Sequence, residues 1–276
     1  MPQKPAWRKL KISEYSSAGS FLRKHENYCV SACSKFLHGS SHIWEYRAGD
    51  ETSALLLYGH RSLNPVFMGN SCLPLPRSFS RFQQLANIHS AAGLKEDLEI
   101  LEPGMKESGY NFTESIDYDL MALDKEPLSA RSGPPGLTFR RPTEEDREEL
   151  FQLQSAYERE EVLPPGGNFN SENCNKQITK FLNSGQILVA CLVGKIAGKI
   201  NTNAVSFTRY QIGGVYVRPE FRGLGIAVEM SAVFLKQLMA EGRGITLFVK
   251  KRNIAAKNVY KRLGFTVLAD YRICYY

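Results

Sequence analysis

The chain has 276 residues, of which 43% are hydrophobic and 23% are charged, and its formal net charge is +7 at pH 7. This is the composition of a soluble globular protein that is long enough for one large or two ordinary domains. No apolar run approaches the roughly 18 residues that a membrane-spanning helix requires, and the basic start of the chain has no apolar segment behind it to form a secretion signal. We therefore expect a cytoplasmic protein without a membrane partner.

The first part of the chain predicts a mixed α/β domain over residues 1–130. Hydrophobic periodicity indicates, in chain order, a helix over 21–37, strands over 42–48 and 53–60, a helix over 78–88 and a strand over 115–123. These segments contain no recognisable chemical motif. One interpretation is that this domain is a degenerate copy of the second half, although no residue-level repeat supports it.

Six cysteines are scattered along the chain without the C-x-x-C spacing of zinc or redox sites. His25, Cys29 and Cys33 would share one face of the helix predicted over 21–37, which would suit three soft-metal ligands. A fourth ligand is missing, and small cysteines on the buried stripe of a helix are far commoner. We expect reduced thiols and no metal.

Residues 129–137, with the sequence SARSGPPGL, are rich in Gly, Pro and Ser and have no hydrophobic period. We place the domain boundary in this segment, so that a second domain spans residues 137–276. Its pattern predicts a mixed central sheet flanked by helices. The expected elements are helices over 143–161 and 171–183, two strands around Gly194-Lys195, a strand over 210–217, a helix between Gly225 and Gly242, a strand over 245–250, a helix over 255–263 and two strands within 265–276.

The positive charge is concentrated towards the end of the sequence. Residues 1–136 contain 15 basic and 15 acidic side chains, whereas residues 176–276 contain 16 basic and 4 acidic ones, a net charge of +12. A segment with this balance is expected to meet an anionic partner, which is either a nucleic acid or a phosphate-bearing cofactor.

A glycine-bearing turn follows the strand predicted over 210–217. Arg222, Gly223, Gly225 and Ala227 stand between this strand and the next helix, whose first amides have no intrahelical acceptor. The helix dipole attracts an anion to these amides, and the small residues let a phosphate approach the backbone closely. The alternative is a tight turn whose glycines serve only a positive φ. A Walker loop and the third glycine of a Rossmann motif are absent from the sequence.

The turn resembles the acyl-CoA pyrophosphate loop of the GCN5-related N-acetyltransferases (GNAT), whose pattern R/Q-x-x-G-x-G/A is met by Arg222, Gly225 and Ala227. The segment GGVYVRPEFRG further resembles the FR47-like, glycine-N-acyltransferase-type branch of that family. The resemblance covers about residues 137–276 and implies a GNAT fold there, with acetyl-CoA as acyl donor. A second family motif, N-x-x-A-x-x-x-Y-x-x-x-G-F, is present as Asn253, Ala256, Tyr260, Gly264 and Phe265.

The resemblance also implies roles for individual residues. The backbone of Val215, Tyr216 and Val217 would pair with the pantetheine arm of the cofactor, and Tyr260 would protonate the departing thiolate. Asn253 would bond to the cofactor arm, beside Ala256 of the same motif. The pyrophosphate would lie on the amides of Arg222, Gly223, Leu224, Gly225, Ile226 and Ala227.

Each of these roles has a purely structural alternative. GGVYV could be only a buried strand with a bulge at Gly213-Gly214. Asn253 could cap the following helix, and Tyr260 could pack its ring with a satisfied hydroxyl. The two motifs occur in order and on the expected elements, which favours the cofactor roles.

The general base cannot be identified from the sequence. The family often uses a glutamate on or near the central strand, and YQIGGVYV contains none. Glu172 and Glu220 are acidic residues in loops near the expected site, but they could equally be solvated surface carboxylates, and a water chain is a further possibility. A basic run would either meet the 3′-phosphate of CoA or form a solvated face, and its residues are Lys250, Lys251, Arg252 and Lys257.

These observations predict an N-acetyltransferase that transfers an acetyl group from acetyl-CoA to a primary amine, such as a small molecule or an amino acid. Two alternatives belong to other classes: a CoA-binding regulatory module without turnover, and a nucleic-acid-binding protein. The second lacks the interleaved aromatic and basic pattern of a stacking platform, so we expect no nucleic-acid partner. The protein is expected to be a monomer or a homodimer.

Overall fold

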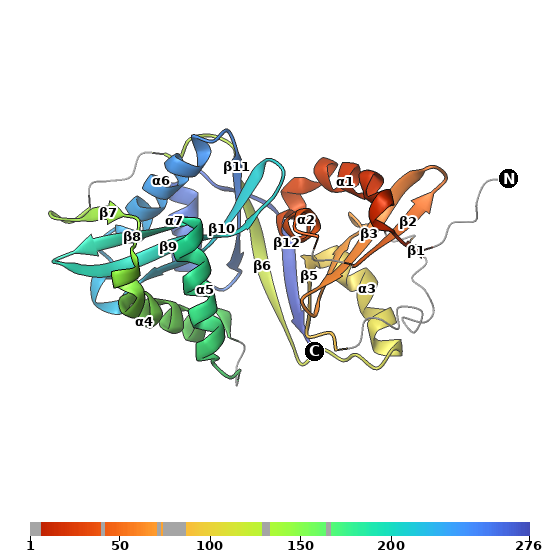
Figure 1. The fold of residues 1–276 in the computed structure, drawn as a ribbon, viewed down its shortest axis with the longest axis horizontal. Coiled ribbons are helices and arrows are strands. Elements are labelled where there is room, and N and C mark those ends of the chain that lie inside the picture. The colour runs from red at the N-terminus through yellow and green to blue at the C-terminus, as the bar shows by residue number, and fades with distance from the viewer. Residues whose placement is uncertain (1–6, 40–41, 71–72, 74–86, 129–132, 164–166) are drawn as a thin grey trace.

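A computed structural model of the chain describes residues 7–39, 42–70, 73, 87–128, 133–163 and 167–276. Figure 1 shows two lobes that meet at shared strands, with strands inside and helices outside. Helices and strands alternate along the chain, which confirms the predicted mixed α/β class. Within the described ranges, none of the helices has the length and apolar character needed to cross a membrane.

The first half contains the three predicted strands, but the strands over 7–9, 62–66 and 90–94 and the helix over 95–107 were not predicted. Its first helix also differs from the prediction. The helix expected over 21–37 is two helices separated by a short 3-10 turn at Glu26–Tyr28. The helix expected over 78–88 falls almost entirely outside the described residues. The elements are β1 (Trp7–Lys9), α1 (Tyr15–Lys24), α2 (Val30–Leu37), β2 (His42–Ala48), β3 (Glu51–Gly59), β4 (Ser62–Val66), β5 (Ser90–Leu94), α3 (Lys95–Glu107) and β6 (Glu114–Leu123).

The second half has the predicted order of elements with two corrections, an unpredicted strand at its start and a change at its end. The two strands expected within 265–276 are one strand of ten residues, because no turn residue interrupts the run. The first helix ends in a π-helical turn, Glu158–Val162. The elements are β7 (Thr138–Arg140), α4 (Arg147–Tyr157), α5 (Ser171–Ser184), β8 (Ile187–Leu192), β9 (Lys195–Val205), β10 (Arg209–Val217), α6 (Ile226–Met239), β11 (Gly244–Lys250), α7 (Ile254–Arg262) and β12 (Thr266–Tyr275).

All twelve strands belong to one sheet, in the order β1-β2-β3-β4-β5-β12-β6-β11-β10-β9-β8-β7. The described elements of both halves follow one plan: a strand, two helices, three strands, and then a strand, a helix and a final strand; the second half also has α6 before its β11. The final strands are exchanged, since β6 pairs with β11 of the second half and β12 pairs with β5 of the first. In Figure 1 these two strands lie at the junction of the lobes. Each lobe is therefore completed by a strand from the other.

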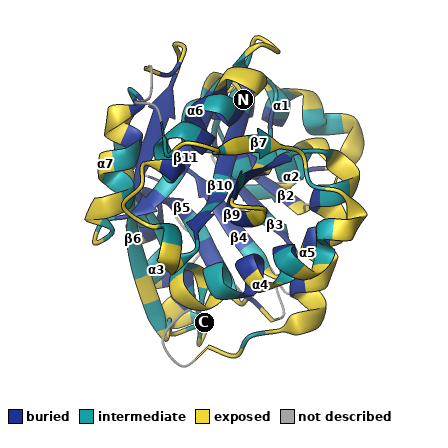
Figure 2. Ribbon diagram, turned by 90° about the vertical axis from the view of Figure 1, so that its left-hand side faces the viewer, coloured by how far each residue is buried: buried dark blue, intermediate teal, exposed yellow. Residues whose placement is uncertain are grey.

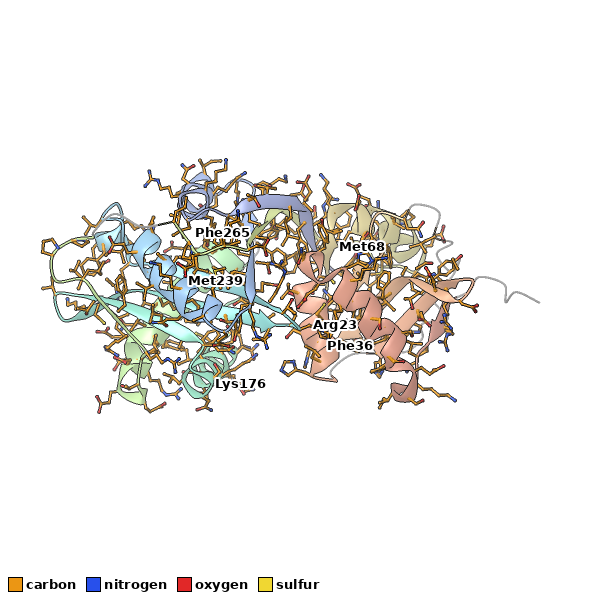
Figure 3. The ribbon with its side chains drawn as sticks, turned by 90° about the horizontal axis from the view of Figure 1, so that it is seen from above. Arg23, Phe36, Met68, Lys176, Met239 and Phe265 are labelled. Carbon is orange, nitrogen blue, oxygen red and sulfur yellow. The ribbon has the colours of Figure 1, made fainter. Side chains whose placement is uncertain are left out.

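A buried carboxylate also joins the lobes. Glu26 is 4% exposed and accepts hydrogen bonds from the turn between β9 and β10: from Ser206 Oγ at 2.5 Å, Thr208 N at 2.7 Å and Thr208 Oγ1 at 2.6 Å. Burial raises the pKa of this carboxyl, but the hydrogen bonds outweigh burial and lower it overall. The ring of Phe207 lies 4.1 Å from the Arg23 guanidinium, and Figure 3 shows Arg23 close to Phe36 on the neighbouring helix.

Two layers of helices cover the sheet of the second lobe. A large apolar cluster joins β8 to β11 with α6 and α7, and a smaller one joins β8 and β9 with α4 and α5. Figure 2 shows the buried strands in the middle and exposed positions on the outer faces of the helices. A lysine, Lys199 of β9, is among the largest fully buried side chains of the described chain.

Candidate active site

The strands β10 and β11 part halfway along their length. Their parallel pairing runs from Arg209 opposite Gly244 to Ile212 opposite Leu247. The register of β10 against β9 then shifts between Gly213 and Tyr216, which confirms the expected bulge. Beyond this point β10 has a free edge that can pair with an extended ligand.

A cleft of about 430 Å³ occupies this gap. We call it the interstrand cleft; it is bounded by residues 213–217 of β10, 248–250 of β11 and one face of α7. Eight of the twelve predicted site residues line it, namely Val215, Tyr216, Val217, Arg222, Ala227, Asn253, Ala256 and Tyr260. The remaining four lie in the loop at its end: Gly223, Leu224 and Gly225 are exposed, whereas Ile226 is buried in the core.

The glycine loop presents bare backbone at the end of the cleft. Gly223 and Gly225 have φ of +81° and +80°, a region that side chains other than glycine rarely adopt. A Cβ built on either residue would meet no atom within 4 Å, so the space above the loop is open. The amides of residues 223–227 donate to no backbone acceptor in the described chain, and α6 begins at Ile226. These amides and the helix dipole together form an anion site.

Tyr260 lies on α7 with its side chain in the cleft lining. The residue is 7% exposed, and its ring packs on Phe265 at 5.7 Å between centroids. Burial raises the pKa of the phenol, and the nearby Tyr157 and Glu161 raise it further. The hydroxyl has no hydrogen-bond partner within the described ranges. It therefore stays protonated at neutral and alkaline pH, with its proton free for a ligand.

Arg222 ties the glycine loop to the end of β10. Its Nε donates to the carbonyl of Val217 at 3.0 Å, and its Nη2 lies 2.8 Å from Glu160 Oε2. Glu160 also accepts a hydrogen bond from the Tyr216 hydroxyl at 2.5 Å. Burial raises the pKa of Glu160, but the bonds from Tyr216 and Arg222 lower it overall. Arg222 thus supports the loop through its side chain.

Asn253 caps α7 and also lines the interstrand cleft. Its Oδ1 accepts from the amide of Ala256 at 3.0 Å, which makes it the N-cap of α7. Its Nδ2 donates to Glu161 Oε1 at 3.2 Å inside the cleft. Lys250, 6% exposed, lies 3.9 Å from the same carboxylate. Glu160 and Glu161 were not predicted, because only the π-helical turn after α4 brings them to the cleft.

Lys199 is a third residue near the cleft that was not predicted from the sequence. Its ammonium donates to Gly214 O at 2.9 Å and to Asn201 Oδ1 at 3.0 Å, directly behind the bulge. Its Nζ also lies 4.7 Å from the centroid of the Tyr157 ring. Burial lowers the pKa of this lysine to about 7, although the charge of Glu158 opposes the shift. The only signal in the sequence is a lysine inside an otherwise apolar strand segment, IAGKI.

Other predicted candidates lie away from the cleft. Glu172 forms an exposed ion pair with Lys176 at 2.7 Å, and neither it nor Glu220 lines the cleft. Lys251 and Lys257 pair with Asp119 at 2.9 and 2.5 Å, so two members of the basic run are already partly neutralised.

The cysteine pair of the first half lies in the core. Cys29 and Cys33 have their sulfurs 3.6 Å apart, and both residues are buried. Among the described residues no group of three or more His, Cys, Asp or Glu side chains could hold a metal ion.

Comparison with known proteins agrees with this geometry. A GCN5-related N-acetyltransferase from Sphaerobacter thermophilus is similar over 99% of this chain and 96% of its own, with 18% identity and a TM-score of 0.60. A Drosophila protein is similar over 99% of both chains, with 13% identity and a TM-score of 0.66. A tandem GNAT protein from the clavulanic acid biosynthesis pathway is similar over 98% of both chains, with 12% identity and a TM-score of 0.57.

These likenesses show the fold over both lobes. No curated protein matches the sequence. Residues 147–265 match the Acetyltransferase (GNAT) family, and they include the glycine loop and Tyr260. This match spans less than half of the chain, and it supports an acyltransferase.

Proposed function

We propose that the protein transfers an acetyl group from acetyl-CoA to a primary amine of a small molecule. One observation carries this proposal: the interstrand cleft ends at the free amides of residues 223–227. An extended arm with a pyrophosphate at one end fits such a site, because the free edge of β10 pairs with the arm and the amides hold the anion.

In this proposal the pantetheine arm lies along Val215, Tyr216 and Val217, and Asn253 bonds to it from α7. The pyrophosphate lies on the amides of residues 223–227; the Arg222 amide, which the sequence had included, already donates to Pro219 O at 3.2 Å. The negative charge of the pyrophosphate complements the dipole of α6 and the guanidinium of Arg222. When the pyrophosphate binds, Arg222 shares its hydrogen bonds between the phosphate and Glu160.

The chemistry needs one proton removed from the amine and one added to the sulfur. The amine nitrogen forms a bond to the acetyl carbon, the carbon–sulfur bond breaks, and the thiolate leaves with CoA. Tyr260 gives its proton to the thiolate and is reprotonated from solvent, while the proton of the amine leaves to water. Because burial raises the pKa of this phenol, it still carries the proton at working pH.

Incubation with acetyl-CoA and a pooled library of amines, read by mass spectrometry, tests the proposal. We expect release of free CoA together with one or more acetylated amines. Binding of CoA without transfer to any amine would favour a regulatory module instead. We place this activity in the cytoplasm, in a monomer or homodimer that needs neither membrane nor nucleic acid.

A further inference from the structure

A second cavity, of about 540 Å³, lies between α4, α5 and β9. Seven of its thirteen lining residues carry side-chain carboxamides, among them Gln154, Asn173 and Asn203. We call it the amide cavity. It shares Tyr157 with the interstrand cleft, so the two cavities adjoin at this residue.

At the bulge of β10, side chains of the amide cavity lie directly against glycines of the cleft. A Cβ built on Gly214 would lie 1.9 Å from Asn201 Oδ1, and one built on Gly213 would lie 2.1 Å from Asn203 Nδ2. Both asparagines line the amide cavity, and both glycines line the cleft. A molecule in the cavity therefore approaches the place where the cleft would hold a thioester.

The polar groups of this wall form a connected row. Lys199 donates to Asn201 at 3.0 Å, and Asn201 Nδ2 donates to Asn203 Oδ1 at 2.8 Å. On the facing helix, Gln154 Nε2 donates to Glu158 Oε1 at 2.8 Å. Gln154 is 3% exposed, and its own Oε1 has no hydrogen-bond partner within the described chain. A buried acceptor left in this state is satisfied by an N–H or O–H donor of a ligand.

The composition of the wall selects the class of ligand. Carboxamides both donate and accept hydrogen bonds without charge, as hydroxyl groups do. The described lining contains one carboxylate, Glu158, which can attract an ammonium, and one cation, Lys180. An apolar amine would leave the amides unpaired, and such a site rejects analogues that lack the matching polar groups.

We propose that the amide cavity binds the acceptor, and that the acceptor is a hydroxylated amine of the amino-sugar or amino-polyol class. This inference rests on the proposed function and names its substrate class. The amine nitrogen reaches the acetyl carbon beside Tyr157, which lines both cavities, with the bonds and protons exchanged as described above. The hydroxyl groups of the acceptor form hydrogen bonds with the carboxamides of the cavity.

Matched acceptors and matched variants test the inference. Glucosamine and cyclohexylamine present the same ring size with and without hydroxyl groups. Asn173→Leu and Asn203→Leu remove exposed carboxamides of the cavity, and Asn175→Leu, on the same helix outside the lining, is the control. We expect kcat/KM for glucosamine to exceed that for cyclohexylamine by about 10²-fold. Both cavity variants should lower kcat/KM for glucosamine by about tenfold and leave the KM for acetyl-CoA unchanged. The control variant should leave both values unchanged.

Calorimetric titration of glucosamine into the CoA-loaded protein gives a readout that does not depend on turnover. Saturable binding that Asn173→Leu weakens supports the inference, even if no acetyl transfer occurs and the proposed function fails. Preference for cyclohexylamine or glycine over glucosamine would overturn it. So would transfer to glucosamine that neither cavity variant affects, or the absence of glucosamine binding.

Discussion

The ammonium nitrogen of Lys199 lies 2.9 Å from the carbonyl oxygen of Gly214, in the bulge that opens the interstrand cleft. The lysine is 1% exposed and has no ion-pair partner among the described residues. Its second bond, to Asn201, joins the bulge to the amide cavity. Burying a cation without a carboxylate partner destabilises the folded state. We therefore infer that Lys199, which lies beside both cavities, has a functional role.

This burial makes stability depend on pH. Because burial lowers the pKa of Lys199 to about 7, the unfolded chain binds a proton that the folded chain has released as pH rises above that value. The free energy of unfolding therefore rises with pH in this window. Between pH 7 and about 9.5 we expect the wild type to gain about 3 kcal/mol relative to Lys199→Met.

Urea unfolding at the two pH values measures this difference. Lys195→Met, on the same strand but exposed, is the control and should follow the wild type. Parallel pH dependence of the wild type and Lys199→Met would show that Lys199 titrates near its ordinary pKa.

The glycine loop can be tested by placing a charge in it. Gly225→Asp puts a carboxylate among the free amides and should weaken CoA binding by at least about tenfold through repulsion of the pyrophosphate. Gly242→Asp is a matched control, since Gly242 also has a positive φ of +74° and open space around it but lies outside the cleft. Calorimetry with CoA should separate the two variants, and equal affinities would place the pyrophosphate elsewhere.

The local elements were largely predictable from the sequence, because they depend on periodicity and turn residues. β2, β6, α5, β10 and β11 lie within one or two residues of their predicted bounds. The exchange of β6 and β12 was not predictable, because strand pairing between distant segments leaves no local pattern. The same applies to the repeated plan of the two halves, which shares its order of elements but no visible residue repeat.

The candidate site was predictable only where a motif marks it. Arg222, Gly225 and Tyr260 belong to such motifs, and their cofactor and catalytic roles stay predictions. Lys199 and Glu161 were missed for physical reasons: burial of a charge depends on tertiary packing, and a π-helical turn shifts which side chains face the cleft.

The exchanged strands predict that the second half does not fold alone. Without β6, the facing edges of β11 and β12 lose their shared partner, and the core loses Met121 and Leu123. Loss of each of these buried side chains lowers the free energy of unfolding by about 2–5 kcal/mol. The two losses together approach the free energy of unfolding of a whole domain. We expect residues 137–276 to show no cooperative thermal transition by circular dichroism, and residues 114–276, which retain β6, to show one. A cooperative transition in the shorter fragment would contradict this.

The first half should bind no CoA of its own. Between β4 and β5, the gap equivalent to the cleft holds only about 10 Å³, and Asn64 Nδ2 bridges it to Ala92 O at 2.8 Å. The carboxylate of Asp97 accepts from the amides of Phe67 and Gly69, each at 2.9 Å, and so occupies backbone donors that an anion would need. Calorimetry should give a stoichiometry of one CoA per chain. A value of two would show that this gap opens.

Tyr260 could act through the proton of its hydroxyl or through the packing of its ring, and a single substitution distinguishes these two roles. Tyr260→Phe keeps the ring that packs against Phe265 and removes only the hydroxyl, which has no partner within the described ranges. We therefore expect nearly unchanged affinity for acetyl-CoA and a kcat lowered by about 10² to 10⁴, the usual loss for a positioned acid. Tyr210→Phe is the control, because Tyr210 is also buried but bonds to Glu241 outside the cleft. Since burial raises the pKa of Tyr260, the wild-type rate should persist to high pH before an alkaline fall that the Phe variant lacks. Steady-state kinetics across pH decide the matter, and a Tyr260→Phe rate within about twofold of wild type would assign the tyrosine to packing alone.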